Sequence, residues 1–409
     1  MSDQVELPLK TKLARANRRR QLVAASLVAP AFVFLVVAFL VPLASILFYA
    51  VENTDVAKYM PRTSEAIAEW DGESTPGEHV FEALFHDLKD GYEAKTIARA
   101  ATSLNHQISG FRSLVMGTAR RTGRIDGPPY RAAILATRPD WANVDIWIAF
   151  QRAAVPITPR YVLAAVDMER SADGAVSWVE EDRQVYIDYL ERTIWISLVV
   201  TVACFVIAFP MAYLMAMGSD KLRRILFILV LLPFWTSLLV RTAAWVILLQ
   251  KNGVVNDALI WTGLTDEPMQ LIFNRFGVYV AMVHVLLPFM ILPMYSVMRT
   301  IPRDHLRASA SLGARPGATF FQVYLPQTLP GVGAGCLLVW VLAIGFYITP
   351  ALVGGGGDQM LSFLIAEFTL KTANWHMAAA LALLLLAMVA VIYPLMARLT
   401  GANRLDVGR

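Results

Sequence analysis

The stretch Arg307–Gly331, RASASLGARPGATFFQVYLPQTLPG, decides the fold of this chain, because it is a polar segment set between two long apolar runs. Leu306–Leu312 is typical of a short helix, and Gly313 stands where the end of a helix favours a positive φ. Pro316 suits the first turn of a second helix, since its missing N–H would have no partner there in any case, and Ala318–Leu325 continues that helix. We therefore predict a rigid elbow, two short helices joined by a tight turn. Such an elbow suits the transmission of force to a partner protein, and it contains no nucleophile–base pair and no metal-ligand cluster.

This elbow resembles the cytoplasmic loop of the permeases of binding-protein-dependent ABC importers. In that family the loop reads roughly Glu-Ala-Ala, three residues, Gly, then an apolar stretch that ends in Leu-Pro. Ala308, Gly313 and Leu325–Pro326 match at the right spacing, and Pro326 also disturbs the second helix. Arg307 and Ser309 depart from the pattern, standing where Glu and the second Ala are usual. The alternative is an ordinary amphipathic loop of another kind of membrane protein.

The resemblance implies that the elbow contacts an ATPase subunit. The residues that it assigns to this coupling contact are Leu306, Arg307, Ala308, Ser309, Gly313, Ala314, Pro316, Phe320, Leu325 and Pro326.

The composition is that of a membrane protein, with 56% hydrophobic and 17% charged residues. Apolar runs of about 20 residues can cross the hydrocarbon core of a bilayer. Such runs predict six transmembrane helices, at Leu22–Tyr49, Ile194–Met217, Ile225–Leu249, Phe276–Met298, Gly331–Val353 and Met377–Ala397. A cleaved signal peptide is the alternative for the first run, but that run is too long and no convincing cleavage site follows it.

Basic residues give the orientation, because short cytoplasmic loops are rich in Lys and Arg. They cluster in Lys10–Arg20, Lys221–Arg224, Arg299–Arg315 and Arg398–Arg409, which all fall on one side if six helices alternate. We therefore expect a multi-pass inner-membrane protein with both termini in the cytoplasm. The same clusters account for the net charge of +4, so the charge is no argument for nucleic acid.

The predicted organisation has five parts. They are a cytoplasmic tail at 1–21, the first transmembrane helix at 22–50, an extracytoplasmic insert at 51–192, a core of five helices at 193–398 that contains the cytoplasmic coupling loop 299–330, and a cytoplasmic tail at 399–409.

Neither a metal site nor a cofactor is predicted. Cys204 and Cys336 fall inside predicted spans and read as small core residues, and the six histidines show no metal-ligand spacing. The glycine run Gly354–Gly357 is not followed by Lys-Ser or Lys-Thr, so it reads as a flexible turn rather than a phosphate-binding loop.

The insert, Val51–Arg192, has the composition of a soluble domain and enough length for one small core. Its spacing favours helices within Glu78–Thr122 and over Trp141–Val155, and short strands at Tyr161–Val166 and Ala175–Val179. We expect a mainly α or α/β domain that helps to seat an incoming partner. The alternative is a solvated, partly ordered loop with no specific task.

A second motif, Pro233–Trp245 or PFWTSLLVRTAAW, resembles the polyamine-type branch of these permeases. The likeness covers about Tyr186–Ala397 and leaves out most of the insert. Arg241 lies inside a predicted span, where a cation costs about 2.5–3.5 kcal/mol and therefore faces protein or a wet cavity. It is either a gate residue or a structural arginine, and Glu367 either meets a cationic substrate or lies on a helix surface. The candidates for a substrate pathway are Trp235, Arg241, Trp245, Tyr347 and Glu367.

Together these patterns predict an all-α membrane protein, with six transmembrane helices in the type I ABC importer permease fold and a large insert. The chain has no Walker A sequence, so ATP must be hydrolysed by separate subunits, and we expect a transport subunit rather than an enzyme. The resemblance implies two ABC ATPase subunits, a second permease subunit and a periplasmic substrate-binding protein as partners, with membrane lipid around them. It also implies uptake of a small solute. A polyamine such as spermidine or putrescine is the family-level expectation, and opines, other small amines and amino acids remain open.

Two other functions were weighed. A secondary transporter driven by an ion gradient would need buried acidic residues in its spans, and the predicted spans have almost none. A membrane sensor or enzyme would need a catalytic constellation in the insert, and the sequence shows none.

Overall fold

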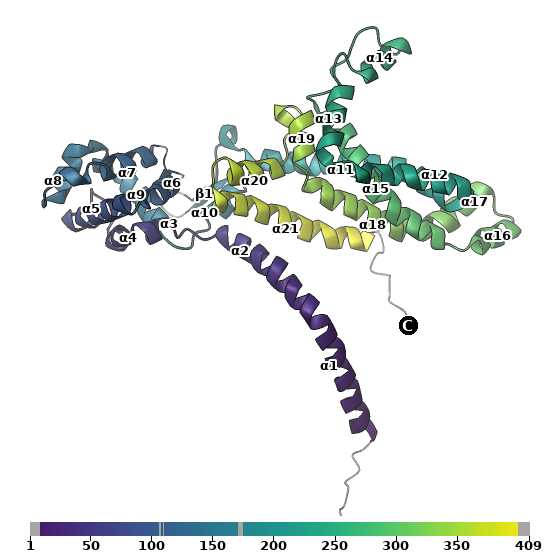
Figure 1. The fold of residues 1–409 in the computed structure, drawn as a ribbon, viewed down its shortest axis with the longest axis horizontal. Coiled ribbons are helices and arrows are strands. Elements are labelled where there is room, and N and C mark those ends of the chain that lie inside the picture. The colour runs from purple at the N-terminus through teal and green to yellow at the C-terminus, as the bar shows by residue number, and fades with distance from the viewer. Residues whose placement is uncertain (1–8, 106–107, 109, 171–174, 400–409) are drawn as a thin grey trace, which may run out of the picture. The chain divides into compact units, whose positions relative to one another are not determined.

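The computed structural model describes residues 9–105, 108, 110–170 and 175–399, and it consists almost wholly of helices (Figure 1). Residues 1–8 and 400–409 of the two predicted tails lie outside the described residues. The chain divides into two compact units, residues 1–158 and 159–409.

The first unit opens with a long apolar helix. It consists of α1 (Leu9–Leu35), a π-helical segment η1 (Val36–Leu40) and α2 (Val41–Tyr49). The 30 residues of Arg20–Tyr49 are long and apolar enough to cross a membrane. The π segment ends two residues before Pro42, which has no N–H to give to a carbonyl one turn back, and the Val41 N–H bonds to the Val36 carbonyl in a π turn.

The rest of the first unit is a helical domain with its own core. Its elements are α3 (Asp55–Tyr59), α4 (Pro61–Ala68), α5 (Glu78–Glu93), α6 (Ile97–Asn105), α7 (Phe111–Ala119), η2 (Thr122–Arg124), α8 (Tyr130–Thr137), η3 (Pro139–Ala142) and α9 (Val144–Ala154). Trp141 and Trp147 are fully buried at its centre. Both indole N–H groups are satisfied, Trp141 donating to Thr118 Oγ1 at 2.9 Å and Trp147 to the Trp141 carbonyl at 2.8 Å. The helices expected within 78–122 and over 141–155 are therefore present.

Asn53 joins the entry and the exit of this domain. Its N–H donates to the Pro156 carbonyl at 2.8 Å, and its side-chain amide donates to the Ala153 carbonyl at 2.8 Å. A bridge pairs Glu52 with Ile157 alongside. The two ends of the domain thus meet, and it forms an ordered unit rather than a loose loop.

The second unit begins with a small hairpin. Its first elements are α10 (Arg160–Ala164), β1 (Met168–Arg170), β2 (Val176–Trp178) and η4 (Glu181–Arg183). The antiparallel pair β1–β2 confirms the strand expected near 175–179. The strand expected at Tyr161–Val166 is wrong: the segment is helical, because Pro159 begins a helix, and the chain then turns at Asp167, whose φ is 52°.

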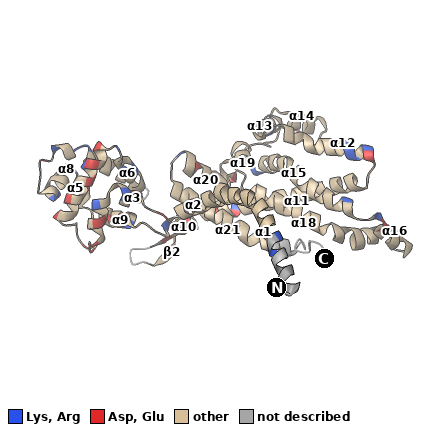
Figure 2. Cartoon of the chain, turned by 60° about the horizontal axis from the view of Figure 1, so that its bottom comes forward, with Lys and Arg blue, Asp and Glu red and all other residues tan. Residues whose placement is uncertain are grey.

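The long helices of the second unit form the membrane core. The elements, in order, are α11 (Tyr186–Met217), α12 (Asp220–Leu231), η5 (Leu232–Trp235), α13 (Leu238–Leu248), α14 (Val254–Trp261), α15 (Arg275–Thr300), α16 (Arg303–Ser311), α17 (Pro316–Thr319), the π segment η6 (Phe320–Tyr324), α18 (Leu325–Ile344), α19 (Ile348–Val353), η7 (Gly356–Asp358), α20 (Leu361–Leu370) and α21 (Trp375–Leu399). Together with Arg20–Tyr49 of the first unit, the described residues contain five helices that could cross a membrane, or six if a bent pair of helices counts as one span. Figure 2 shows few charged residues along α11, α15 and α18, and many in α3–α9.

Two of the expected spans are interrupted. The run Ile225–Leu249 is a pair of helices bent by 101°, not one straight helix. Pro233 lies in the 3-10 segment η5 just before the break, and Ser237 starts a new helix by accepting from the Val240 N–H. The run Gly331–Val353 ends its helix at Ile344, and α19 follows as a separate element.

Small residues let α18 pack closely on α15. A Cβ added to Gly331 would lie 2.8 Å from Val297 Cβ, and one added to Gly335 would lie 2.8 Å from Met290 Sδ. α11 packs against both helices. Contact of this kind is how helices associate in lipid, where burial of apolar surface gives little drive.

The sequence predicts that the insert is extracytoplasmic, and this can be tested at Ser74, which is exposed between α4 and α5. The native cysteines, Cys204 and Cys336, are free and lie in the second unit, buried and half-buried. We expect Ser74→Cys to react with a membrane-impermeant maleimide in cells whose outer membrane alone is permeabilised. Ser311→Cys on the elbow should react only after the inner membrane is broken. The reverse order of labelling would contradict the proposed orientation.

The buried carboxylate of Asp87 should make the insert sensitive to pH. Its Oδ2 accepts from the Thr63 N–H at 2.7 Å and the Thr63 hydroxyl at 2.8 Å, yet burial outweighs these bonds and raises the pKa of Asp87 above its usual value. Between the usual and the raised pKa the folded insert holds more protons than the unfolded chain, so its stability falls as pH rises through that window.

Asp87→Asn should flatten this dependence, because the amide oxygen can still accept from Thr63 but carries no charge. The measurement is hydrogen exchange of α4 and α5 in the intact chain at several pH values, corrected for the intrinsic rate. Asp90→Asn, at an exposed ion-pair partner of Arg62, is the control. An Asp87→Asn profile as steep as that of the wild type would contradict the assignment.

Candidate functional site

The elbow has the predicted turn. α16 ends at Ser311, and Gly313 has a φ of 86°. The Gly313 N–H donates to the Ala310 carbonyl at 3.0 Å and the Ala314 N–H to the Ser309 carbonyl at 3.2 Å, which closes the end of the helix. The first helix begins earlier than expected, at Arg303 rather than Leu306, directly after Pro302.

The second half of the elbow is longer than predicted. Pro316 lies in the first turn of α17, as expected. The helix does not stop near Pro326, however, but runs through η6 into α18 and on to Ile344. Pro326 lacks the N–H that would bond one turn back, and the Leu325 N–H bonds to the Phe320 carbonyl in a π turn. The elbow is therefore continuous with a span of the membrane core.

The two faces of α16 differ. Leu306 and Ser309 are half-buried on the inner face, and Leu306 packs with Phe320 against the membrane core. The outer face presents Arg307 and Ala308 to solvent, and Leu312 at the turn is 89% exposed. Arg307 pairs with Asp304 at 3.4 Å, but both side chains are exposed and such a pair contributes only about 0–1 kcal/mol.

The other predicted coupling residues differ in exposure to solvent. Gly313, Pro316 and Pro326 are exposed, and Ala314, Phe320 and Leu325 are half-buried.

Aromatic rings fix the base of the elbow to α11. The Phe320 ring meets those of Phe209 and Tyr213 edge-on, at 6.1 and 6.0 Å between centroids. The buried Tyr324 ring meets Tyr213 in the same way at 5.4 Å. The base of the elbow is therefore packed against α11 and continuous with α18.

A polar cluster lies within the membrane core, on α13, α15 and α19. The Trp245 indole N–H donates to His284 Nδ1 at 3.1 Å, and the hydroxyls of Thr242 and Thr349 lie 3.2 Å apart. Arg241 is close enough to act electrostatically on His284. Its buried Nε has no hydrogen-bond partner among the described residues.

The structure brings together only part of the predicted pathway. Arg241 and Trp245 share this cluster, whereas no hydrogen bond or ring contact within the described residues links Trp235, Tyr347 or Glu367 to it. Trp235 is 81% exposed, Tyr347 precedes α19, and Glu367 pairs with Lys371 at 3.5 Å. The sequence reasoning missed His284, although a lone histidine in an apolar run is itself a signal.

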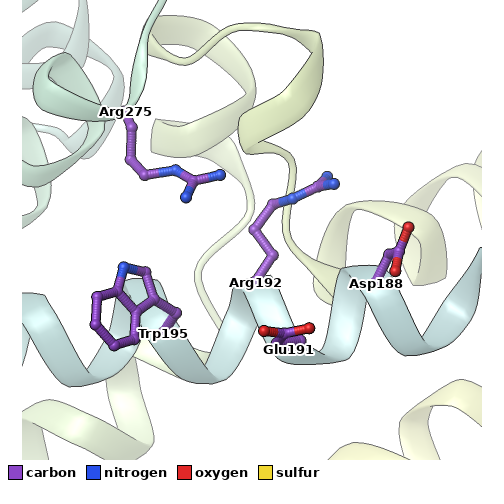
Figure 3. A pocket seen from close by; sticks show the side chains of 5 residues that line it. All are labelled: Asp188, Glu191, Arg192, Trp195 and Arg275. Atoms are coloured by element: carbon purple, nitrogen blue, oxygen red, sulfur yellow. The ribbon is translucent and has the colours of Figure 1, made fainter.

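A second feature lies where α11 and α15 begin. Asp188, Glu191, Arg192, Trp195 and Arg275 line an open pocket of about 350 Å³ (Figure 3). Figure 3 shows the side chains of Arg192 and Arg275 extending on the same side of α11. Both arginines bind the segment Asp358–Gln359, which follows the glycine run. Arg275 Nε lies 3.1 Å from the Asp358 carboxylate, and Arg192 donates to the Gln359 carbonyl at 3.2 Å.

The Gly354–Gly357 turn is thus fastened at its end. Asp358 also accepts from the Gly355 N–H at 3.0 Å, and a Cβ added to Gly354 would lie 2.6 Å from the Pro350 carbonyl oxygen. As for metals, no three His, Cys, Asp or Glu side chains in the described part of the chain are placed to hold an ion.

Comparison with known proteins identifies a family. The family model of the binding-protein-dependent transport system inner membrane component matches residues 194–403. The spermidine/putrescine transport system permease protein PotB of Salmonella typhimurium strain SL1344 is 32% identical over 226 residues, which cover 54% of this chain and 79% of that protein. The inner membrane ABC transporter permease protein YdcU of Escherichia coli K12 is 35% identical over 232 residues, which cover 53% and 73%.

Two solved structures are also similar. The first is a bacterial ABC transporter involved in the import of the acidic polysaccharide alginate, with 18% sequence identity and a TM-score of 0.44, covering 56% of this chain and 85% of that chain. The second is the methionine ABC transporter MetNI in an inward-facing conformation, with 19% sequence identity and a TM-score of 0.42, covering 53% of this chain and 94% of that chain. The family model covers more than half of the chain, and the permease proteins are matched over more than two thirds of their length. The chain therefore belongs to the family of binding-protein-dependent transport system inner membrane components.

Proposed function

We propose that this permease imports a small amine of the polyamine class, and that separate ATPase subunits drive it through the elbow. The relatives named as spermidine/putrescine permeases support the substrate class. The observation that carries the coupling role is the two-faced α16, whose outer face is free while its inner face is fixed to the membrane core. Gly313 and Pro316 set the turn between the two helices, and the continuous helix into α18 gives the second half of the elbow the stiffness that coupling requires.

The remaining proposals concern partners and orientation. We place the elbow and both termini in the cytoplasm and the insert on the outer side, where it would help to seat the binding protein. A second permease subunit would complete the gated path, as the resemblance to importer permeases implies. Alternating access would follow when closure of the ATPases moves the elbow and, through η6, α11 and α18.

Gly313→Val tests the elbow. No atom lies within 4 Å of a Cβ added at this glycine, so the change acts through the backbone, and a β-branched residue strongly disfavours the φ of 86°. We expect loss of spermidine uptake and weaker co-purification of the ATPases, with membrane insertion unchanged.

Gly317→Val is the matched control, because that glycine is equally open and has no positive φ. Normal uptake and normal ATPase association in Gly313→Val would refute the coupling role.

Arg241→Met tests the pathway. Methionine keeps an unbranched stem and removes the charge, so little packing is lost. We expect an assembled complex with altered spermidine uptake per complex in reconstituted vesicles. An unchanged value would remove Arg241 from the pathway, and a loss of folded complex would assign it a structural role.

A further inference from the structure

Two hydrogen bonds tie α16 to the helix that follows it. Ser309 Oγ lies 3.0 Å from Thr319 Oγ1, and His305 Nδ1 lies 2.9 Å from Gln327 Oε1. We propose that these two pairs are positioning residues that transmit force from α16 to the membrane core, an inference that rests on the proposed coupling role of the elbow. They are called the brace below.

The Ser309–Thr319 bond crosses the turn of the elbow. The two residues are ten positions apart, and both are half-buried. Ser309 stands one turn after Leu306 on the inner face of α16, where the family pattern has an alanine that could make no such bond. Its hydroxyl bonds outside its own helix, whereas serine within a helix often bonds to a carbonyl one turn back. The departure from the pattern therefore adds a contact at the inner face.

The His305–Gln327 bond joins the first turns of α16 and α18. Gln327 donates its side-chain amide to the Val323 carbonyl at 2.7 Å, which directs the amide oxygen toward His305. An amide oxygen only accepts, so His305 Nδ1 carries the proton in this pair. The histidine is exposed, whereas Gln327 is half-buried.

The positions of the brace relative to η6 give it a mechanical role. Thr319 comes directly before the π segment Phe320–Tyr324, and Gln327 comes three residues after it. α16 is thus bonded to both flanks of the least regular part of the helix. The covalent link, in contrast, is the exposed turn at Gly313, which has open space around it. Without the brace, α16 could swing about this turn and leave α18 behind.

The test uses the full complex, co-expressed with its ATPases and reconstituted with its binding protein. The probe is radiolabelled spermidine, and the readout is spermidine transported per ATP hydrolysed. Ser309→Ala and Thr319→Ala should each lower this ratio about 2- to 10-fold, the effect of losing one hydrogen bond. The double variant should be no worse than either single one, because the two hydroxyls form one bond.

Conservative variants separate positioning from packing. Ser309→Thr keeps a hydroxyl and His305→Asn keeps a donor near Nδ1, so both should hold the ratio near the wild-type value, while His305→Ala should lower it. Thr262→Ala, at the end of α14, removes an exposed hydroxyl that bonds only to carbonyls of its own helix, so it is the control and should change nothing. ATPase co-purification should stay normal in all of them.

Hydrogen exchange of α16 in the purified chain tests the brace without any transport. Exchange of α16 should be faster in Ser309→Ala and His305→Ala than in the wild type and in Thr262→Ala. Equal exchange and equal transport ratios in these variants would overturn the brace. Loss of ATPase association in Ser309→Ala would also overturn it, since it would place that residue in the partner contact. A wild-type complex that takes up no spermidine would contradict the proposed function instead, while the exchange measurement would still decide the brace.

Discussion

The close approach of α18 to α15 is the constraint on which the rest of the membrane core depends. At Gly331 and Gly335 there is no room for even a Cβ, so the two backbones lie nearly in contact. In lipid, such contact replaces much of the burial that holds water-soluble proteins together. It fixes α18, which carries the elbow, against α15, which carries His284. The elbow and the polar cluster around His284 are therefore both attached to one closely packed pair of helices.

Proline shapes the places where this core departs from straight helix. Pro42 and Pro326 each follow a π segment, and Pro233 lies at the 101° bend between α12 and α13. In each case a missing N–H leaves a carbonyl to be satisfied differently, which in a membrane requires a local adjustment or a neighbouring helix. Pro326 thus places irregular backbone at the elbow, and Pro233 precedes the bend that leads into α13, which carries Arg241 and Trp245.

Much of this was predictable from the sequence, for identifiable reasons. Gly313 and Pro316 act through their own backbone geometry, so the turn of the elbow could be read directly, and long apolar runs marked most of the spans. The partners of His284 and Asp358 could not be read, since Trp245 lies 39 positions from His284 and Arg275 lies 83 positions from Asp358. The apolar residues of Tyr161–Val166 are compatible with a strand or with a helix, so the sequence pattern predicts a strand there. The segment is helical because the helix begins directly after Pro159. The bend after Pro233 could not be predicted from hydropathy, because an apolar run shows that a segment is buried in lipid but not whether its helix is straight.

The central claim is that the outer face of α16 meets an ATPase. The most direct measurement is photo-cross-linking in the assembled complex, in a chain whose Cys204 and Cys336 are replaced by serine. A maleimide–benzophenone reagent, which needs a thiol on this chain only, is attached to a cysteine in place of the exposed Ala308 or, as a control on the insert, of Ser74. The account predicts a cross-link from position 308 to the ATPase subunit and none from position 74. A complex in which position 308 links only to the binding protein, or in which the ATPase is reached from position 74, would contradict it.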